Sequence, residues 1–136
     1  MPVTLISDLD ERSWNAISVE AAPIEATIIG AYIHDVTTNT GYVESDQSNR
    51  HPFPITLPLG HVIYGNISTK NTGLAPVRMR VLIELIDPDG IVRHSIWTSF
   101  NTVNPGVSMA SAQVPQTTLN KLGTWILHGV IEGEPA

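Results

Sequence analysis

The sequence predicts an all-β protein, folded as an antiparallel β-sandwich. Its most informative stretch, residues 76–100, holds two apolar-rich runs on either side of Asp87-Pro88-Asp89-Gly90. This tetrapeptide favours a tight turn, because proline presets φ at the second position and glycine accepts a positive φ. Further turn signals recur at short intervals after residue 57, which is typical of an antiparallel sandwich. The last apolar run, TWILHGVIEG, is apolar on both faces and so indicates a central strand.

The central hairpin is expected to join residues 77–86 to residues 91–100, with Ile86 opposite Ile91. In this register, one face is almost wholly apolar and should point to the core. It pairs Leu85 with Val92, Ile83 with His94, Val81 with Ile96, Met79 with Thr98 and Val77 with Phe100. The other face sets Glu84 opposite Arg93, and Arg80 opposite Trp97 as a cation–π pair. A shorter loop with a bulge is the alternative, and it would shift the pairing.

The first part of the chain, residues 1–56, is predicted to be an N-terminal arm with one or two strands and a loop. Ser7 followed by acidic residues resembles a helix start, which predicts a short helix through about Ile17. The β-branched residues of 24–36 predict a strand, with a bulge at Gly30. Residues 42–58 are polar and rich in proline, and they predict a long loop or linker.

The sandwich domain is expected to span residues 57–136. Alternation over residues 61–70 predicts a strand that ends in the turn signal of Asn71-Thr72-Gly73. Small residues over 107–114 predict a weak edge strand, and residues 117–122 read as a connector before the last strand.

The order LPLGHVIYGNISTKNTG, DPDG, NPG and GTW, over about residues 57–132, resembles Ig-like and fibronectin-like modules of extracellular proteins. It looks most similar to CARDB-type adhesion modules. This resemblance implies an Ig-like sandwich of seven strands that serves adhesion, spacing or assembly and carries no catalytic site.

Composition narrows the range of partners. The net charge is −6, and residues 1–57 hold eight acidic and two basic side chains, which argues against a nucleic-acid partner. There is no cysteine, so disulfides and thiolate metal sites are excluded. The first residues do not resemble a signal peptide, and no apolar run is long enough for membrane insertion. The localisation stays open between two favoured places: a virion, which suits a chain with no signal peptide, and an extracellular surface, which the resemblance implies.

Candidate chemical residues are few. The five histidines show no spacing that would place two metal ligands on one strand or helix face, so we expect no metal and no cofactor. Asp87 and Asp89 are better explained by turn formation than by calcium binding. The Asn66-Ile67-Ser68 triplet falls inside a predicted strand, which disfavours glycosylation there. No nucleophile elbow is present, and we expect no catalytic residue and no enzyme activity.

The most distinctive feature of the predicted surface is a set of arginine and tryptophan side chains on the outer face of the predicted hairpin. An interface is expected at Arg78, Arg80, Arg93 and Trp97, with Trp14 of the arm packing against it in the same chain or in a neighbour. The expected role is a non-catalytic structural subunit of a larger assembly, such as a capsid decoration or tail component of a virion. The expected partners are copies of the chain itself or other assembly subunits. The alternative is an adhesion or carbohydrate-binding module of a larger secreted protein.

Overall fold

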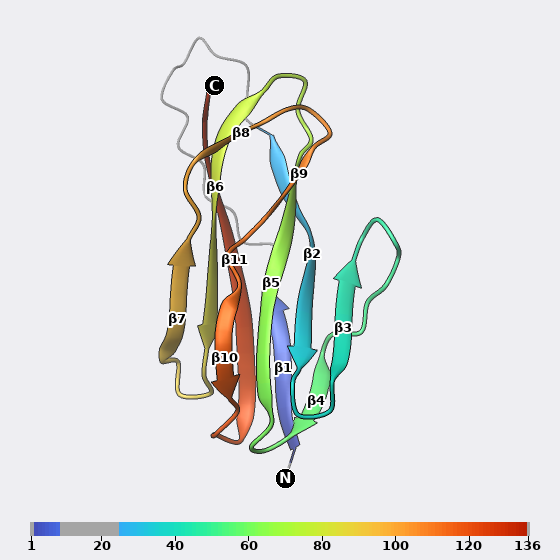
Figure 1. Cartoon of the computed structure of the whole chain (residues 1–136), viewed down its shortest axis with the longest axis vertical. Coiled ribbons are helices and arrows are strands. Elements are labelled where there is room, and N and C mark those ends of the chain that lie inside the picture. Colours follow the sequence, from blue (N-terminus) through green and yellow to red (C-terminus); the bar gives the residue numbers. More distant parts are fainter. Residues whose placement is uncertain (1, 9–24, 136) are drawn as a thin grey trace.

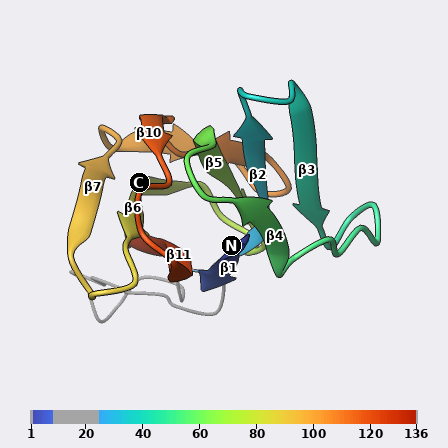
Figure 2. The same ribbon diagram turned by 90° about the horizontal axis from the view of Figure 1, so that it is seen from below.

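The computed structural model describes residues 2–8 and 25–135, and in these residues eleven strands form two packed sheets. Figure 1 shows strands running along the long axis of the molecule, and Figure 2 shows the two sheets as layers seen from one end. The predicted antiparallel β-sandwich is therefore confirmed.

Sheet A has the strand order β4-β1-β11-β6-β7, and β8 also pairs with β6. All its pairings are antiparallel except that of β1 with β11, which is parallel. Its strands are β1 (Pro2–Asp8), β4 (Ile55–Pro58), β6 (Val77–Ile86), β7 (Val92–Trp97), β8 (Asn101–Val103) and β11 (Gly123–Pro135).

Sheet B has the order β10-β5-β2-β3, and β9 also pairs with β5. All its pairings are antiparallel. Its strands are β2 (Ala26–Asp35), β3 (Thr40–Ser45), β5 (Val62–Asn71), β9 (Ser108–Ala110) and β10 (Val114–Thr118).

The core lies between the sheets and is built by alternate residues of the long strands, as the period of two requires. Trp125 on β11 is fully buried, and its indole N–H donates to the carbonyl oxygen of Lys121 at 3.0 Å. Other large side chains with almost no exposure are Leu5, Ile33, Ile63, Ile67, Met79, Ile83, Leu85, Leu119, Leu127 and Ile131.

The β6–β7 hairpin has the predicted core face on β6 but not the predicted register. Two of the residues predicted to face the core across from β6 do not do so: Val92 is 46% exposed, and the Phe100 ring lies against the outward Arg78 and Arg80. Ile83 pairs with Ile96 and Leu85 with His94, so the expected pairing is wrong by two residues. The cause is that the loop is longer than predicted. Ile91 stays in the turn, where its N–H donates to Asp87 Oδ1 at 3.0 Å. The register also shifts by a bulge between Leu85 and Ile86. A shift of two residues returns each side chain to the same face, so the buried set on β6 is unchanged.

The expected boundary between an arm and a sandwich at Leu57 is not what the strand pairing shows. β1 lies inside sheet A between β4 and β11, and β2 lies inside sheet B between β5 and β3. Val3 and Leu5 are fully buried in the shared core. Residues on both sides of position 57 thus complete the same two sheets, because neither sheet can cover its apolar face without them.

Two local predictions before residue 57 are also corrected. Residues 42–58 are not a simple linker, because β3 and β4 occupy parts of this range. Ser7 is not a helix N-cap, because it lies in β1 opposite Leu127. The remainder of the predicted helix, and Trp14, lie outside the described residues. By contrast, the predicted bulge at Gly30 is confirmed by a register shift between Ile28 and Gly30.

Near the end of the chain, the predicted edge strand over 107–114 is divided between β9 and β10. The predicted connector over 117–122 is partly wrong, because β10 extends to Thr118 and pairs with β5. The last strand is central as expected, with β1 on one side and β6 on the other.

Candidate functional site

Four connections gather at one end of the sandwich, the lower end in Figure 1: residues 36–39, 59–61, 87–91 and 119–122. They contact one another through the backbone as well as through side chains. Gly60 N–H donates to the Leu119 carbonyl at 2.9 Å, and Leu119 N–H donates to the His61 carbonyl at 2.8 Å. We call this surface the loop end.

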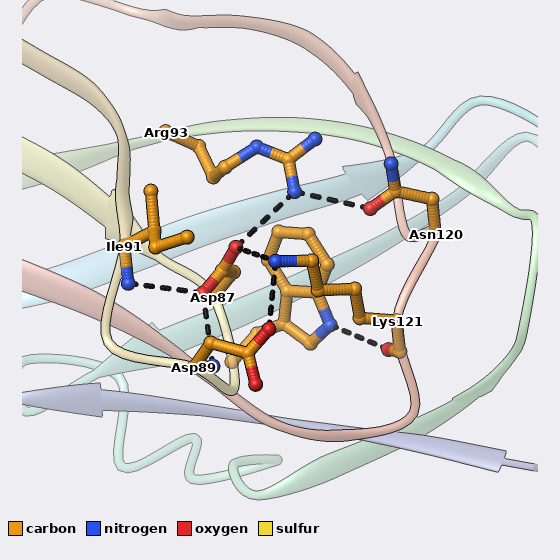
Figure 3. A network of polar contacts seen from close by, with 7 residues as sticks. Asp87, Asp89, Ile91, Arg93, Asn120 and Lys121 are labelled. Atoms are coloured by element: carbon orange, nitrogen blue, oxygen red, sulfur yellow. Dashed lines mark hydrogen bonds and ion pairs between the residues drawn. The ribbon is translucent and has the colours of Figure 1, made fainter.

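Asp87 organises the turn between β6 and β7 (Figure 3). Its buried carboxylate accepts hydrogen bonds from the N–H of Asp89 at 2.9 Å and from the N–H of Ile91 at 3.0 Å. Its other oxygen lies 2.8 Å from Lys121 Nζ and 3.4 Å from Arg93 Nη1. One carboxylate therefore holds its own turn and also the loop before β11.

The electrostatics of Asp87 favour the charged form. Burial acts to raise the pKa of its carboxyl group, but the Lys121 ammonium and the two backbone N–H groups outweigh burial and lower the pKa to about 2. The same contact, together with Asp89, raises the pKa of Lys121. The ion pair is therefore complete throughout the neutral pH range.

Further contacts join this centre to the core. Lys121 Nζ also lies 2.8 Å from Asp89, and Arg93 Nη1 donates to Asn120 Oδ1 at 3.0 Å. The Arg93 guanidinium lies 5.2 Å from the centroid of the buried Trp125 ring. These contacts connect Asp87, Asp89, Arg93, Asn120 and Lys121, and we call the set the Asp87 network.

Asp35 plays a similar part in the turn between β2 and β3. Its buried carboxylate accepts from the N–H of Thr37 and the hydroxyl of Thr38, both at 3.0 Å, and lies 2.7 Å from His61 Nδ1. Burial acts to raise the pKa of Asp35, but the contacts with His61 and Thr38 give a net lowering. Two turns at the loop end are thus each fixed by a buried aspartate.

Large apolar side chains are exposed around these fixed loops. Among the described residues, seven large apolar side chains are exposed, and four of them lie in or beside the loop-end connections. Their exposed fractions run from 45% to 54%, for Leu59, Ile91, Val92 and Leu122. Lys121 and Asp89 carry opposite charges on the same loops. The loop end is therefore apolar and has charges of both signs beside it.

Three of the predicted interface residues do come together, on the outer face of sheet A. The Arg80 guanidinium lies 4.1 Å from the centroid of the Trp97 ring, and the Arg78 guanidinium lies 5.3 Å from that of Phe100. Arg93 is not part of this group, since it belongs to the Asp87 network at the loop end. Trp14 lies outside the described residues, so its predicted contact is not described.

The acidic partners of Arg78 and Arg80 were not predicted from the sequence. Arg78 pairs with Glu134 at 2.8 Å, and Arg80 pairs with Glu132 at 2.7 Å. The sequence does contain a pattern that could have indicated these pairs: Glu132 and Glu134 are two positions apart, as Arg78 and Arg80 are. The pattern becomes informative only once β11 is known to pair with β6, which sets Glu132 opposite Arg80 and Glu134 opposite Arg78. The predicted pair of Glu84 with Arg93 is wrong, because Glu84 Oε1 lies 3.0 Å from His128 instead.

A second group that spacing did not reveal is formed by Glu44, Asp46 and His51. One ligand atom from each of these side chains lies within 4.8 Å of the others. They meet because Ser45 and Arg50 form a bridge that folds the chain back on itself after β3. Glu44 is already engaged by His51 and by the N–H of Phe53, and the histidine pKa is raised chiefly by its contact with Glu44.

The fold and the loop end together define a β-sandwich with a preorganised loop surface. Comparisons of the chain with protein family models, with curated proteins and with solved structures found no match. The resemblance to CARDB-type modules therefore stays a prediction. Within residues 2–8 and 25–135, no helix is long and apolar enough to span a membrane.

Proposed function

We propose that the protein is a non-catalytic structural and interaction module, a β-sandwich subunit of a larger assembly such as a virion. In this proposal, subunits contact copies of themselves through the loop end. The observation that carries the proposal is the group of exposed apolar side chains, Leu59, Ile91, Val92 and Leu122, on loops that Asp87 and Asp35 hold in place.

The rigidity of these loops favours binding. Association costs conformational entropy when flexible side chains and loops become ordered. Here the turns are already ordered by buried carboxylates, so they lose less conformational entropy when a partner binds. Apolar side chains with charged residues beside them also match the apolar core and polar rim of protein–protein interfaces.

A second copy of the chain is the partner that fits best. In a two-fold contact the same patch is used on both sides, so a patch of one charge would repel its own copy. The loop end avoids such repulsion, because Asp89 and Lys121 carry opposite charges and pair with each other within each copy. The charged groups of the Asp87 network satisfy one another, which supports a structural rather than a catalytic use of this end.

The test is sedimentation velocity over a wide range of protein concentration. We expect the wild-type chain to self-associate and the double variant Ile91→Ser/Leu122→Ser to do so at least about tenfold more weakly, a change of about 1.4 kcal/mol. Leu74→Ser is the matched control, because Leu74 is fully exposed in the connection between β5 and β6, away from the loop end. A wild-type chain that stays monomeric, or a double variant that associates as well as wild type, would contradict the proposal.

A further inference from the structure

We propose a binding site for neutral carbohydrate on the outer face of sheet B, on a different surface from the loop end. Burial alternates along β2 and β5, so residues on either side of each buried one point away from the core. The outward residues include Tyr32 and His34 on β2, and Tyr64, Asn66 and Ser68 on β5. We call these five residues the tyrosine face.

Aromatic rings form the first part of the site. The Tyr32 and Tyr64 ring centroids are 6.5 Å apart, and the His34 and Tyr64 centroids are 5.0 Å apart. Tyr32 Oη lies 2.8 Å from His34 Nδ1, which ties the histidine to the cluster. The electron-rich faces of such rings attract the C–H groups of a sugar ring, which carry a small positive charge.

A shallow hollow of about 150 Å³ adjoins the rings. Tyr32, Val43 and Ser68 line it, together with Gln47 and the bulged segment 29–31. The hollow exists because β2 bulges at Gly30, where a side chain is excluded: a Cβ atom would lie 2.4 Å from the Glu44 carbonyl oxygen. Since pockets for drug-sized ligands usually exceed about 300 Å³, this hollow suits one ring of a ligand whose remainder lies across the aromatic cluster.

Hydrogen-bonding groups around the hollow are uncharged and available. The side chains of Gln47, Asn66 and Ser68 make no hydrogen bond to another described residue. An amide both donates and accepts, as does a hydroxyl, which matches the hydroxyl groups of a sugar. The carboxylate of Glu44, which also lines the hollow, is engaged by His51 and by Phe53 N–H.

The charge of this face decides the ligand class. A phosphate or nucleic-acid ligand needs arginine or lysine side chains at the site, and none lines the hollow. The outward side of β5 carries one cation, Lys70, which follows the tyrosine face two positions after Ser68. The outer face of sheet A differs, because arginine–glutamate pairs cover part of it. Aromatic rings, amides and hydroxyls beside a ring-sized hollow point to a neutral saccharide.

The test is titration of the ¹⁵N-labelled full chain with cellohexaose, xylohexaose and mannohexaose, followed by amide NMR shifts. At least one of the three should give saturable shifts confined to β2, β3, β5 and the bulge at Gly30. Tyr64→Ala and Asn66→Ala should each weaken binding at least about tenfold, whereas Tyr64→Phe keeps the ring and should bind nearly as well as wild type. Ser68→Phe should abolish binding by filling the hollow, and Trp97→Ala on sheet A is the matched control that should leave it unchanged.

Three results would overturn this site: no saturable shifts with any of the three sugars, shifts that map to other surfaces, or wild-type affinity in Ser68→Phe. Thermal unfolding and the amide spectrum of each variant establish that it is folded, and Tyr64→Phe serves if Tyr64→Ala is not. Because the loop end plays no part here, sedimentation of Ser68→Phe should match that of wild type. Failure of the sugar site is therefore distinguishable from failure of the assembly proposal.

Discussion

The Asp87 carboxylate and the Lys121 ammonium lie 2.8 Å apart and connect the turn after β6 to the loop before β11. The carboxylate is fully buried, whereas about a third of the lysine side chain is exposed. Removing the cation would leave a buried charge with fewer partners, which is the costly way to break such a pair. The contact is therefore a sensitive point for the stability of the loop end.

The stability of the fold should depend on pH through Asp87. Its folded pKa of about 2 lies below the ordinary value of 3.8, so its stabilising contribution is complete above pH 3.8 and is lost as the pH falls through about 2. Urea unfolding followed at a series of pH values should show this loss between about pH 4 and pH 2. In Asp87→Asn the curve should start lower at neutral pH and fall less across this window.

Asp89→Asn is the matched control for this experiment. Asp89 lies in the same turn and contacts the same lysine, but most of its side chain is exposed. Its effect should be clearly smaller than that of Asp87→Asn. Equal effects of the two substitutions would show that the buried position of Asp87 does not matter.

Ile83→Ala should lower the free energy of unfolding by about 2–5 kcal/mol, because Ile83 is fully buried between the sheets. Leu82→Ala, on the outer face of β6, should cost less because its neighbours across the strands, Trp97 and Val130, do not belong to the main core. Leu82 is nevertheless buried, so the loss should be measurable. Chemical denaturation of both variants is the measurement, and a larger loss for Leu82→Ala would contradict the assignment of faces.

Leu5→Ala tests whether the start of the chain belongs to the core. Leu5 is fully buried in β1, so the substitution should cost about 2–5 kcal/mol in the same assay. Thr4→Ala in the same strand is the control, because Thr4 is only partly buried and should cost far less. A change within about 0.5 kcal/mol for Leu5→Ala, the usual size for surface positions, would restore the idea of a dispensable arm.

A double-mutant cycle on Arg80 and Trp97 should give a coupling energy of about 0.5–1 kcal/mol, as expected for a cation–π contact near the surface. The cycle is made with alanine at each position and read by chemical denaturation. Arg78 and Trp97 form the control pair, because the nearest ring to the Arg78 guanidinium is that of Phe100. Coupling of similar size in both cycles would show that net charge, rather than ring contact, is the cause.

Much of the fold was predictable because its signals are local. The turn at Asp87-Pro88-Asp89-Gly90 was recognisable from residue types, and Gly90 does adopt the positive φ that the turn requires. The core face of β6 was predictable because the period of two survives a register error of two residues. The contact of Arg80 with Trp97 also survived, because Trp97 lies diagonally opposite Arg80 on the same face.

The predictions that were wrong depended on contacts that local residue patterns do not show. β3 carries a weak local pattern and becomes a strand because its long neighbour, β2, offers it an edge to pair with. The register of the hairpin depended on whether Ile91 belonged to the turn, which a side-chain contact from Asp87 decided. The interface prediction grouped Arg93 with Arg78 and Arg80 because alternation alone cannot show that a bulge redirects one of them.

The strands with strong alternation, their buried faces and the main turns follow from the residue order alone, because they depend on residues a few positions apart. The neighbours of each strand and the contacts between side chains depend on the way the whole chain folds. Lys121 is 34 positions from Asp87, and Glu132 is 52 positions from Arg80. Contacts at such separations leave no local periodicity in a single sequence, and they form only when strand pairing brings distant segments together.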